Sequence, residues 1–428
     1  MAAAYTLLGR MATPALRYWL AKRAQRGKED VSRIGERFGH ASTPRPAGAL
    51  VWLHAASVGE TQSVLTLVRA LLARHPQLHL LITTGTVTSA ALVAQQQLPR
   101  VIHQFVPVDT APAVGRFLAH WQPDLALWVE SEFWPQLLWK THARGIPILL
   151  INARISARSF AGWMRWPGII RSVLQCFAAL YAGSAQDADR LRRLGAAEVR
   201  VHDIGNLKYD AAPLPMNESL VAMLQKITAG RHTWVAASTH ANEEEMIADV
   251  HQALLPQFPD LLTILIPRHA SRGDSLAEAL RARGITLSQR SKAEPVTAHT
   301  GMYLADTMGE LGSFFRATDI VFLGGSLIAH GGHNPLEPAR LSCAVITGPH
   351  THNFAAIMEH LQAAEAIYVA QHKEELAAAL CRLFTDDTVR IGLAERVQKT
   401  ANEARGAGET ILQHVTQLLQ HPAQKEAA

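Results

Sequence analysis

The stretch ALVWLHAASVGE, residues 49–60, decides the fold of this chain. Its first seven residues are almost all apolar, as expected of a strand that is buried on both faces of a parallel sheet. Ser57 and Gly59 then lead into residues 61–74, where apolar side chains recur at helical spacing. The pattern predicts a strand followed by a helix, which is the repeating unit of parallel α/β proteins.

The same alternation of apolar run and amphipathic stretch recurs along most of the chain. In the first half we expect further strands at 79–84, 101–107, 124–130, 146–152, 178–183 and 199–205. After the proline-rich stretch YDAAPLPMN (209–217), the rhythm restarts with strands expected at 232–238, 261–267, 319–325 and 343–348. The sequence therefore predicts an α/β protein with two Rossmann-like domains.

Besides the two domains, we expect a separate segment at each end of the chain. We expect an amphipathic helix over residues 1–30, a first domain over 31–210, a second over 211–393, and a helical segment over 394–428. The last segment is expected to pack back toward the first domain.

The length, charge and cysteine content of the chain indicate what kind of protein it is. The chain has 428 residues, 48% of them hydrophobic and 18% charged, so it can bury more than one core. A formal charge of +5 suits phosphorylated partners or an anionic membrane surface. Cys176, Cys343 and Cys381 show no metal-ligand spacing, which is typical of reduced thiols in the cytoplasm.

The first 28 residues predict contact with a membrane surface. Arg10 and Arg17 interrupt the apolar run well short of the ~20 residues that a spanning helix needs. Tyr18 and Trp19 are followed by a cluster of cations, Lys22, Arg23, Arg26 and Lys28. This pattern favours a helix in the headgroup region of a bilayer, and an ordinary docked helix is the alternative.

Polar residues that follow the expected strands are the candidate site, because ligands of open parallel sheets bind beyond the carboxyl ends of the strands. In the first half, Glu60 lies in the first turn of a helix, where the macrodipole favours an ionised carboxylate that can accept a proton. Glu130 follows another strand, and Lys208 in GNLKYD is a plausible cation for it. A helix cap and a plain buried ion pair are the structural alternatives.

The second half supplies residues suited to a nucleotide. Arg268 and His269 follow a strand and suit phosphate, and Gly309, Glu310 and Leu311 precede a helix expected from Leu311. In HGGHNPLEPA (330–339), two glycines allow close approach of a ligand to the backbone. We expect Asn334 to cap a helix, Pro335 to open it and Glu337 to accept hydrogen bonds from ribose hydroxyls. Solvated loops and a capped helix are the alternatives.

Other nucleotide and metal sites are not supported. The chain has neither a GxGxxG after a strand nor a GxxxxGK[ST], so it lacks the motifs of dinucleotide oxidoreductases and P-loop NTPases. Histidines cluster at 330, 333, 350 and 352, but without a cysteine or aspartate pattern, so we expect no metal.

Taken together, these motifs resemble those of the lipid A Kdo transferases, enzymes that transfer 3-deoxy-D-manno-oct-2-ulosonic acid (Kdo) from CMP-Kdo. The resemblance extends through RIGERFG (33–39), HAASVGE (54–60), ESEFWP (130–135), NARIS (152–156), GNLKYD (205–210), IPRH (266–269), DTMGEL (306–311), GGHNPLEPA (331–339) and GPHTHNF (348–354). It implies a GT-B fold with two domains facing a cleft, at the cytoplasmic face of the inner membrane.

The resemblance also implies roles for individual residues. It makes Glu60 the general base of an inverting transfer, with Glu130 and Lys208 stabilising the transition state. It assigns CMP binding to Arg268, His269, Gly309, Glu310, Leu311, Asn334, Pro335, Leu336 and Glu337. The implied partners are CMP-Kdo, a phosphorylated lipid A precursor such as lipid IVA and the membrane surface, with no nucleic acid and no cofactor besides the donor substrate.

Two rival functions remain open at this point. A nucleotide-sugar epimerase has the same fold but needs no acceptor lipid, and a non-catalytic nucleotide-binding membrane adaptor would not need Glu60. The sequence leaves open the number of Kdo residues transferred and the oligomeric state.

Overall fold

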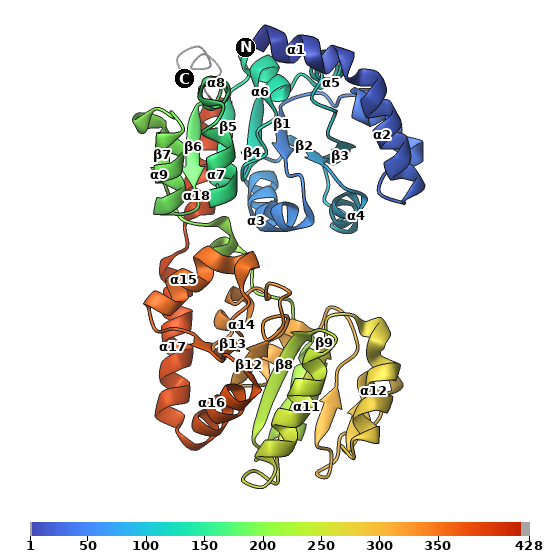
Figure 1. Cartoon of the computed structure of the whole chain (residues 1–428), viewed down its shortest axis with the longest axis vertical. Coiled ribbons are helices and arrows are strands. Elements are labelled where there is room, and N and C mark those ends of the chain that lie inside the picture. Colours follow the sequence, from blue (N-terminus) through green and yellow to red (C-terminus); the bar gives the residue numbers. More distant parts are fainter. Residues whose placement is uncertain (1, 421–428) are drawn as a thin grey trace. The chain divides into compact units, whose positions relative to one another are not determined.

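The chain forms two units, each with its own parallel sheet (Figure 1). The computed structural model describes residues 2–420. The first unit contains the residues up to Ala211 and those from Arg405, and the second contains Ala212–Ala404.

The first unit is built on a seven-stranded sheet of order β3-β2-β1-β4-β5-β6-β7. The strands are β1 (Leu50–His54), β2 (His79–Thr84), β3 (Val101–Phe105), β4 (Leu125–Val129), β5 (Ile148–Ala153), β6 (Ala179–Ala182) and β7 (Val201–Asp203). All the pairs are parallel, and β1 runs between β2 and β4 with Leu53 opposite Ile82 and Leu127. Every strand expected in this half is confirmed.

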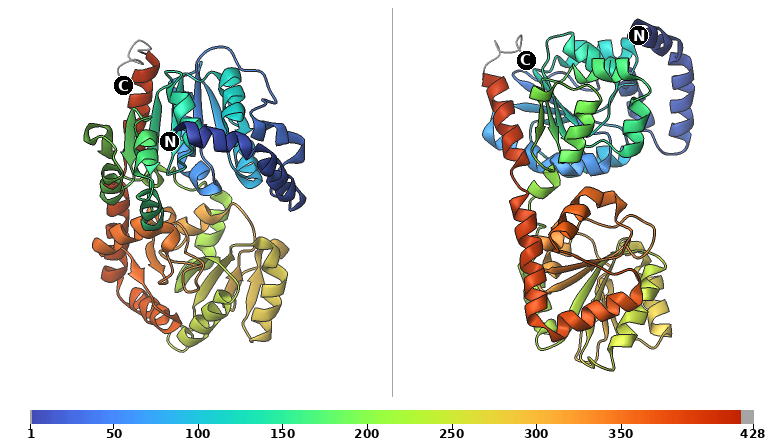
Figure 2. Two further views of the ribbon diagram at one scale, coloured as in Figure 1. Left: turned by 45° about the horizontal axis from the view of Figure 1, so that its top comes forward. Right: turned by 60° about the vertical axis from the view of Figure 1, so that its left-hand side comes forward.

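Helices cover both faces of this sheet, as Figure 2 shows. Leu50 and Trp52 of β1 pack into one core, whereas Val51 and Leu53 pack into the other, as the period of a strand requires. The helices and turns are α1 (Ala2–Met11), α2 (Thr13–Gln25), η1 (Val31–Phe38), α3 (Val58–Arg74), α4 (Val87–Gln95), α5 (Ala111–Trp121), α6 (Pro135–His142), α7 (Ala157–Trp163), α8 (Pro167–Leu174), α9 (Ala185–Arg193), η2 (Glu198–Arg200), η3 (Leu207–Asp210) and α18 (Ala407–Gln420).

The N-terminal segment forms two helices rather than the single helix that we expected. The break falls at Ala12, because Pro14 lies in the first turn of α2 and favours a new helix start there. Leu20 is the buried residue of α2, whereas Tyr18 and Trp19 are exposed. Of the helices described, none combines the length and apolarity needed to cross a membrane.

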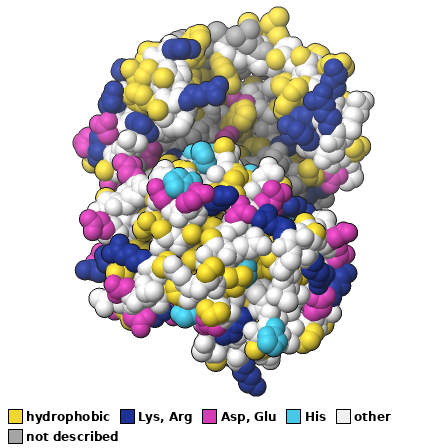
Figure 3. Space-filling view, turned by 60° about the horizontal axis from the view of Figure 1, so that its bottom comes forward, with side chains coloured by type: hydrophobic (Ala, Val, Ile, Leu, Met, Phe, Trp, Pro, Cys, Tyr) yellow, Lys and Arg dark blue, Asp and Glu magenta, His cyan; other side chains and the backbone are white. Residues whose placement is uncertain are grey.

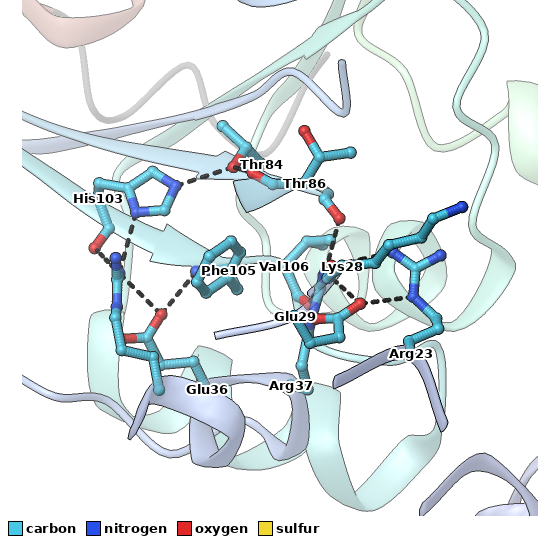
Figure 4. Close-up of polar contacts among 12 residues, drawn as sticks. Arg23, Lys28, Glu29, Glu36, Arg37, Thr84, Thr86, His103, Phe105 and Val106 are labelled. Atoms are coloured by element: carbon cyan, nitrogen blue, oxygen red, sulfur yellow. Dashed lines mark hydrogen bonds and ion pairs between the residues drawn. The ribbon is translucent and has the colours of Figure 1, made fainter. Parts of the chain in front are cut away.

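A network of ion pairs holds the segment after α2 against the sheet (Figure 4). Arg37 pairs with the buried Glu29 at 2.9 Å and donates to the carbonyl oxygens of Gly85 and Val106. Glu36 pairs with Arg33 and accepts from the backbone N–H of Phe105. RIGERFG therefore fixes the chain at the carboxyl ends of β2 and β3.

The chain returns to the first unit at Arg405, not at residue 394 as expected. Residue 394 lies inside α17 (Asp387–Glu403), which packs against β13 and α14 of the second unit. The helix that does pack on the first unit is α18, which buries Ile411, Leu412 and Val415 in the core beside α3.

The second unit repeats the architecture with a sheet of order β10-β11-β9-β8-β12-β13-β14. Its strands are β8 (Thr233–Thr239), β9 (Leu262–Pro267), β10 (Leu287–Gln289), β11 (Met302–Leu304), β12 (Ile320–Leu323), β13 (Ala344–Thr347) and β14 (Tyr368–Val369). The four expected strands are confirmed, and β10, β11 and β14 are additional. Those three have only two or three residues, too few to produce a recognisable period.

Helices again flank this sheet and enclose one apolar core. They are α10 (Glu218–Thr228), α11 (Glu243–Leu254), η4 (Ala270–Arg272), α12 (Gly273–Ala282), η5 (Arg290–Lys292), α13 (Leu311–Arg316), α14 (Leu336–Ala339), η6 (His352–Phe354), α15 (Ala355–Ala363), α16 (Lys373–Thr385) and α17.

Charged side chains of both signs are interspersed on the surface. In the face drawn in Figure 3, Lys and Arg side chains occur in several separate groups among Asp and Glu.

Candidate active site

Glu60 lies at the carboxyl end of β1, where the chain turns into α3. Ser57 is the N-cap, and its hydroxyl accepts from the N–H of Glu60 while donating to Oε1 at 2.7 Å. The N–H of Ala56 donates to Oε2 at 2.8 Å. Both carboxylate oxygens therefore have a partner, in an arrangement close to a capping box.

Burial, rather than the helix dipole, dominates the protonation of Glu60. Burial raises the pKa of Glu60 to about 7, the hydrogen bonds from Ser57 and Ala56 lower it, and the charges of Glu130 and Glu132 add to the rise. We expected the helix start to keep this carboxylate ionised; burial opposes that effect, so both the neutral and the ionised form are present near pH 7. A group with a pKa near 7 can both accept and release a proton there.

Glu130 follows β4 in an unusual backbone conformation. Its φ is +57°, a left-handed value that costs free energy for a residue with a side chain. Burial raises the pKa of Glu130, while the charges of Lys208 and Arg154 oppose the rise. The strained turn therefore holds a carboxylate inside the unit, where these two cations favour its ionised form.

Lys208 is held at the same sheet edge by a loop with its own anchors. Burial lowers the pKa of Lys208, and the charges of Glu130 and Glu60 raise it. Asn152, at the end of β5 with a φ of +51°, accepts from the N–H of Leu207 at 3.0 Å. The first unit thus brings Glu60, Glu130 and Lys208 into one electrostatically coupled group.

The C-terminal helix also fixes the Lys208 loop. Asp210, two residues after Lys208, accepts from the N–H groups of Gly406 and Gly408 at 2.8 and 2.6 Å. These amides lie at the start of α18, where a helix favours negative charge.

In the second unit, cationic and imidazole side chains gather after β8, β9 and β12. His240 lies 3.1 Å from His333 between their Nε2 atoms, and its ring lies 3.8 Å from that of His330. Burial, the neighbouring histidines and the charge of Arg268 together lower the pKa of His240 and of His333 to about 4. His269 completes the group, with its ring 5.9 Å from that of His240.

The stretch from Asn334 to Glu337 differs slightly from the expected helix start. The helix α14 begins at Leu336, so Pro335 precedes it rather than opening it. Asn334 still caps the turn, since its Oδ1 accepts from the N–H of Leu336 at 3.1 Å. Burial raises the pKa of Glu337, and the charges of Arg340 and Arg268 oppose that rise.

The double glycine serves the protein's own packing. A Cβ on Gly331 would lie 2.4 Å from Nδ2 of Asn353, and Gly332 has a φ of +73°. The amides of Gly325, Ser326 and Leu327 all donate to the buried carboxylate of Glu243, at 2.6 to 3.1 Å. The double glycine is therefore in close contact with the 350–353 loop, and the approach of a ligand to its backbone stays a prediction.

Gly309, Glu310 and Leu311 lie where the sequence placed them, directly before α13. Gly309 has a φ of +83°, and α13 begins at Leu311 as expected. The carboxylate of Glu310 is occupied, because Arg290 binds both its oxygens at 2.6 Å. Only the backbone of this turn is then suited to a ligand.

We also looked for a possible metal site among the residues that the structure describes. There, His, Cys, Asp and Glu form no group of three or more arranged to hold an ion.

Comparison with known proteins identifies the family. Residues 32–211 match the family model for 3-deoxy-D-manno-octulosonic-acid transferase (kdotransferase). A probable mitochondrial 3-deoxy-D-manno-octulosonic acid transferase of Arabidopsis thaliana is 35% identical over 372 residues, which cover 85% of this chain and 83% of that protein. The chain belongs to the Kdo transferase family. It is a glycosyltransferase.

A bacterial Kdo transferase is equally similar. The 3-deoxy-D-manno-octulosonic acid transferase of Haemophilus influenzae is 34% identical over 388 residues, 89% of this chain and 90% of that protein. The resemblance inferred from the motifs is thereby confirmed, and the non-catalytic adaptor is excluded.

The fold of this Kdo transferase is the GT-B fold. The crystal structure of UDP-GlcNAc 2-epimerase from Neisseria meningitidis bound to UDP-GlcNAc matches with a TM-score of 0.58, over 86% of this chain and all of that one. At 12% identity the likeness concerns the fold alone. The sequence relatives, not this neighbour, identify the enzyme, so the epimerase alternative is not supported.

Sequence reasoning missed several residues of this Kdo transferase that organise the site. Asn152 and Arg154 lie in NARIS, which had been used only as a motif, and His240 and Glu243 follow β8. The rule that polar residues after a strand form the site would have selected His240 as well. Glu243 has one local amide partner, the N–H of His240 at 3.4 Å, whereas its other amide partners, Gly325, Ser326 and Leu327, lie more than 80 residues away.

Proposed function

We propose that this Kdo transferase takes Kdo from CMP-Kdo and adds it to a phosphorylated lipid A precursor, lipid IVA, in lipopolysaccharide biosynthesis. The observation that carries the proposal is Glu60, a buried carboxyl group with a pKa of about 7 in one charge-coupled group with Glu130 and Lys208. An acceptor hydroxyl is a weak nucleophile near neutral pH, so a base of this strength is what the reaction requires.

The proposed reaction is a single displacement with inversion at the anomeric carbon. The acceptor hydroxyl oxygen forms a bond to that carbon, and its proton passes to Glu60. The bond between the carbon and the phosphate oxygen breaks, and CMP leaves with the electron pair. Lys208 supplies positive charge to this region, and Glu130 keeps Lys208 in place and charged.

The donor is assigned to the second unit. Arg268 and His269 suit the phosphate, and the backbone from Gly309 to Leu311 suits the nucleoside. Asn334, Pro335 and Leu336 form the turn that presents Glu337 to the ribose hydroxyls. No cofactor besides the donor substrate is needed, because CMP is a good leaving group once cations neutralise its phosphate.

The acceptor is a membrane lipid, so the enzyme has to reach the bilayer. We assign this contact to α1 and α2, where Met11, Tyr18 and Trp19 are exposed. Arg23 lies over the Trp19 ring at 4.7 Å and Lys22 over the Tyr18 ring at 5.0 Å, so cations accompany the exposed aromatic rings. Such a surface suits peripheral attachment to an anionic leaflet, here the cytoplasmic face of the inner membrane.

A test of the proposal measures the release of CMP from CMP-Kdo with and without lipid IVA. We expect release that depends on the lipid and is lost in Glu60→Gln, with CMP binding unchanged by calorimetry. Glu409→Gln is the matched control, because Glu409 is also a first-turn carboxylate of this unit but half exposed. Release without the lipid, or full activity of Glu60→Gln, would refute the proposal.

A further inference from the structure

Two apolar cavities lie in the first unit, and the second adjoins Ala56, whose N–H donates to Glu60. The first, of about 910 Å³, lies among α6, α7 and α8 and is lined by Phe133, Trp163, Trp166 and Ile169. The second, of about 630 Å³, lies beneath α1 and α2 and is lined by Leu16, Trp19, Leu20 and Val108. Tyr5 and Trp134 line both, so the two cavities share a wall.

The shared wall is fixed by a partly buried carboxylate, that of Asp109. Asp109 accepts from the Tyr5 hydroxyl at 2.9 Å and from the N–H of Leu137, in the first turn of α6, at 2.8 Å. Tyr5 also packs edge-on against Trp139, with ring centroids 5.8 Å apart. The first helix is thus locked to α6, and the cavities are a built feature of this unit.

One end of the second cavity reaches the catalytic group. Its lining includes Ala56, whose N–H donates to Glu60, and Gly85, whose carbonyl accepts from Arg37. Its other end is formed by the helices assigned to the membrane. The lining of this cavity therefore extends from the neighbour of the proposed base to the proposed membrane-facing helices, and it includes the charged side chains of Arg23, Glu29 and Arg37.

The rim of the first cavity has the chemistry of a lipid headgroup region. Trp134 and Trp166 line this cavity and are exposed, at 41% and 60%. Arg158 lines the same cavity, and among the described residues its side chain has no hydrogen-bond or ion-pair partner. An apolar cavity with exposed aromatic residues and a cation at its rim suits the acyl chain of a lipid that has a phosphorylated headgroup.

We propose that these two cavities receive acyl chains of the acceptor lipid and so position its sugar hydroxyl at Glu60. The inference rests on the proposed function, in which the acceptor is a lipid. On this inference the enzyme selects acceptors by the length of the acyl chain that it buries, since each methylene removed from water strengthens binding about fourfold.

The test fills the first cavity without disturbing the fold. Gly162 lines it, and a Cβ there would meet nothing within 4 Å, so Gly162→Phe occupies the cavity from the exposed side of α7. Gly115→Phe is the matched control, because Gly115 is also helical and open to a Cβ but lines neither cavity.

Direct binding is measured with brominated myristic acid below its micellar concentration, through quenching of tryptophan fluorescence. We expect saturable quenching in the wild type and an affinity reduced about tenfold in Gly162→Phe, the loss that displacing about two buried methylenes produces. Gly115→Phe should bind like the wild type. Absence of saturable quenching, or equal affinity in the two variants, would overturn the inference.

Transfer kinetics separate this inference from the proposed function. We expect Gly162→Phe to raise KM for the acylated acceptor and to leave KM for its deacylated sugar phosphate unchanged. A wild-type enzyme that uses both acceptors with the same KM would refute the acyl site while leaving Kdo transfer intact. Quenching by the fatty acid without any lipid-dependent transfer would support the cavities and refute the proposed function.

Vesicle binding distinguishes a chain-binding cavity from a face that only lies on the bilayer. Gly162→Phe should sediment with anionic vesicles as the wild type does. Loss of vesicle binding with unchanged quenching would mean that the α7 region lies on the bilayer and holds no chain.

Discussion

Glu60 carries two opposing influences on one carboxyl group. Its oxygens accept hydrogen bonds that complete the start of α3, which favours the charged form, while burial favours the neutral form. Because burial is the larger influence, the group titrates near pH 7 rather than near 4.5. A residue that only capped a helix would gain from staying ionised, so the shift argues for a role in proton transfer.

The rate of transfer should therefore follow the ionisation of Glu60. Since a base must be unprotonated, we expect kcat to fall as the pH drops below about 7, and Glu60→Gln to lower kcat by roughly 10²- to 10⁴-fold and abolish this dependence. The measurement is kcat with CMP-Kdo and lipid acceptor across neutral pH. A wild-type profile that is flat through pH 7 would exclude Glu60 as the base.

The same pKa makes a prediction about stability. The folded pKa, about 7, lies above the unfolded value near 4.5, so the folded state binds more protons between these values and loses stability as the pH rises through them. Glu60→Gln removes the penalty, which is at most about 3 kcal/mol. In urea unfolding, we expect the variant to be more stable than the wild type at pH 8 and no more stable below pH 4.5. An equal difference at both pH values would contradict the assigned shift.

A substitution of Glu337 tests the proposed contact with the ribose of the donor. If its carboxylate accepts hydrogen bonds from the ribose, Glu337→Ala should weaken CMP binding several-fold by calorimetry. Glu395→Ala, an exposed position on α17 of the same unit, should bind CMP like the wild type. Unaltered affinity in Glu337→Ala would remove the ribose contact.

A site residue could be predicted from the sequence when its hydrogen-bond partners lie close to it in the chain. Glu60 and Glu337 stand beside their own capping residues, so a local pattern marks them. Glu243 is different, because it satisfies amides of a loop that starts at Gly324, and only tertiary contact reveals this. The close contact of Gly331 with Asn353 could not be predicted for the same reason, since Asn353 belongs to another loop.

At the scale of elements, long buried strands were predictable and short ones were not. A strand such as β1 is covered by helices on both faces and is apolar throughout, which produces a clear signal. The edge strand β10 has three residues and β14 has two, so neither produces a period. The boundary expected between residues 393 and 394 falls inside α17, because that helix continues to Glu403.

The contact between η3 and α18 predicts an effect of a distant helix on catalysis. Asp210 binds the first amides of α18 and lies two residues from Lys208, so Asp210→Ala should loosen the loop that places this cation. We expect a stability loss of about 1–3 kcal/mol in urea unfolding and a lower kcat, with CMP affinity unchanged. Asp210→Asn, which keeps one acceptor oxygen, should lie between the wild type and Asp210→Ala. A normal kcat in a destabilised Asp210→Ala would limit α18 to a structural role.

At the scale of the whole molecule, chemistry and donor binding are assigned to different units. The acid–base group of Glu60, Glu130 and Lys208 belongs to the first, and the residues assigned to CMP all lie within 268–337 of the second. Each unit has its own sheet and its own apolar core. The linker rich in proline predicted this division from the sequence, whereas the return of the chain at Arg405 required the structure.

This division predicts that donor binding survives separation of the units. A fragment of residues 212–404 contains the whole second sheet, its core and every residue assigned to CMP, so it should fold and bind CMP with an affinity close to that of the full chain. It should release no CMP from CMP-Kdo in the presence of the lipid, because it lacks Glu60 and Lys208. Circular dichroism establishes that the fragment is folded, and calorimetry then measures the affinity. A folded fragment that does not bind CMP would mean that the first unit supplies part of the nucleotide site, and the assignment to 268–337 would have to be extended across both units.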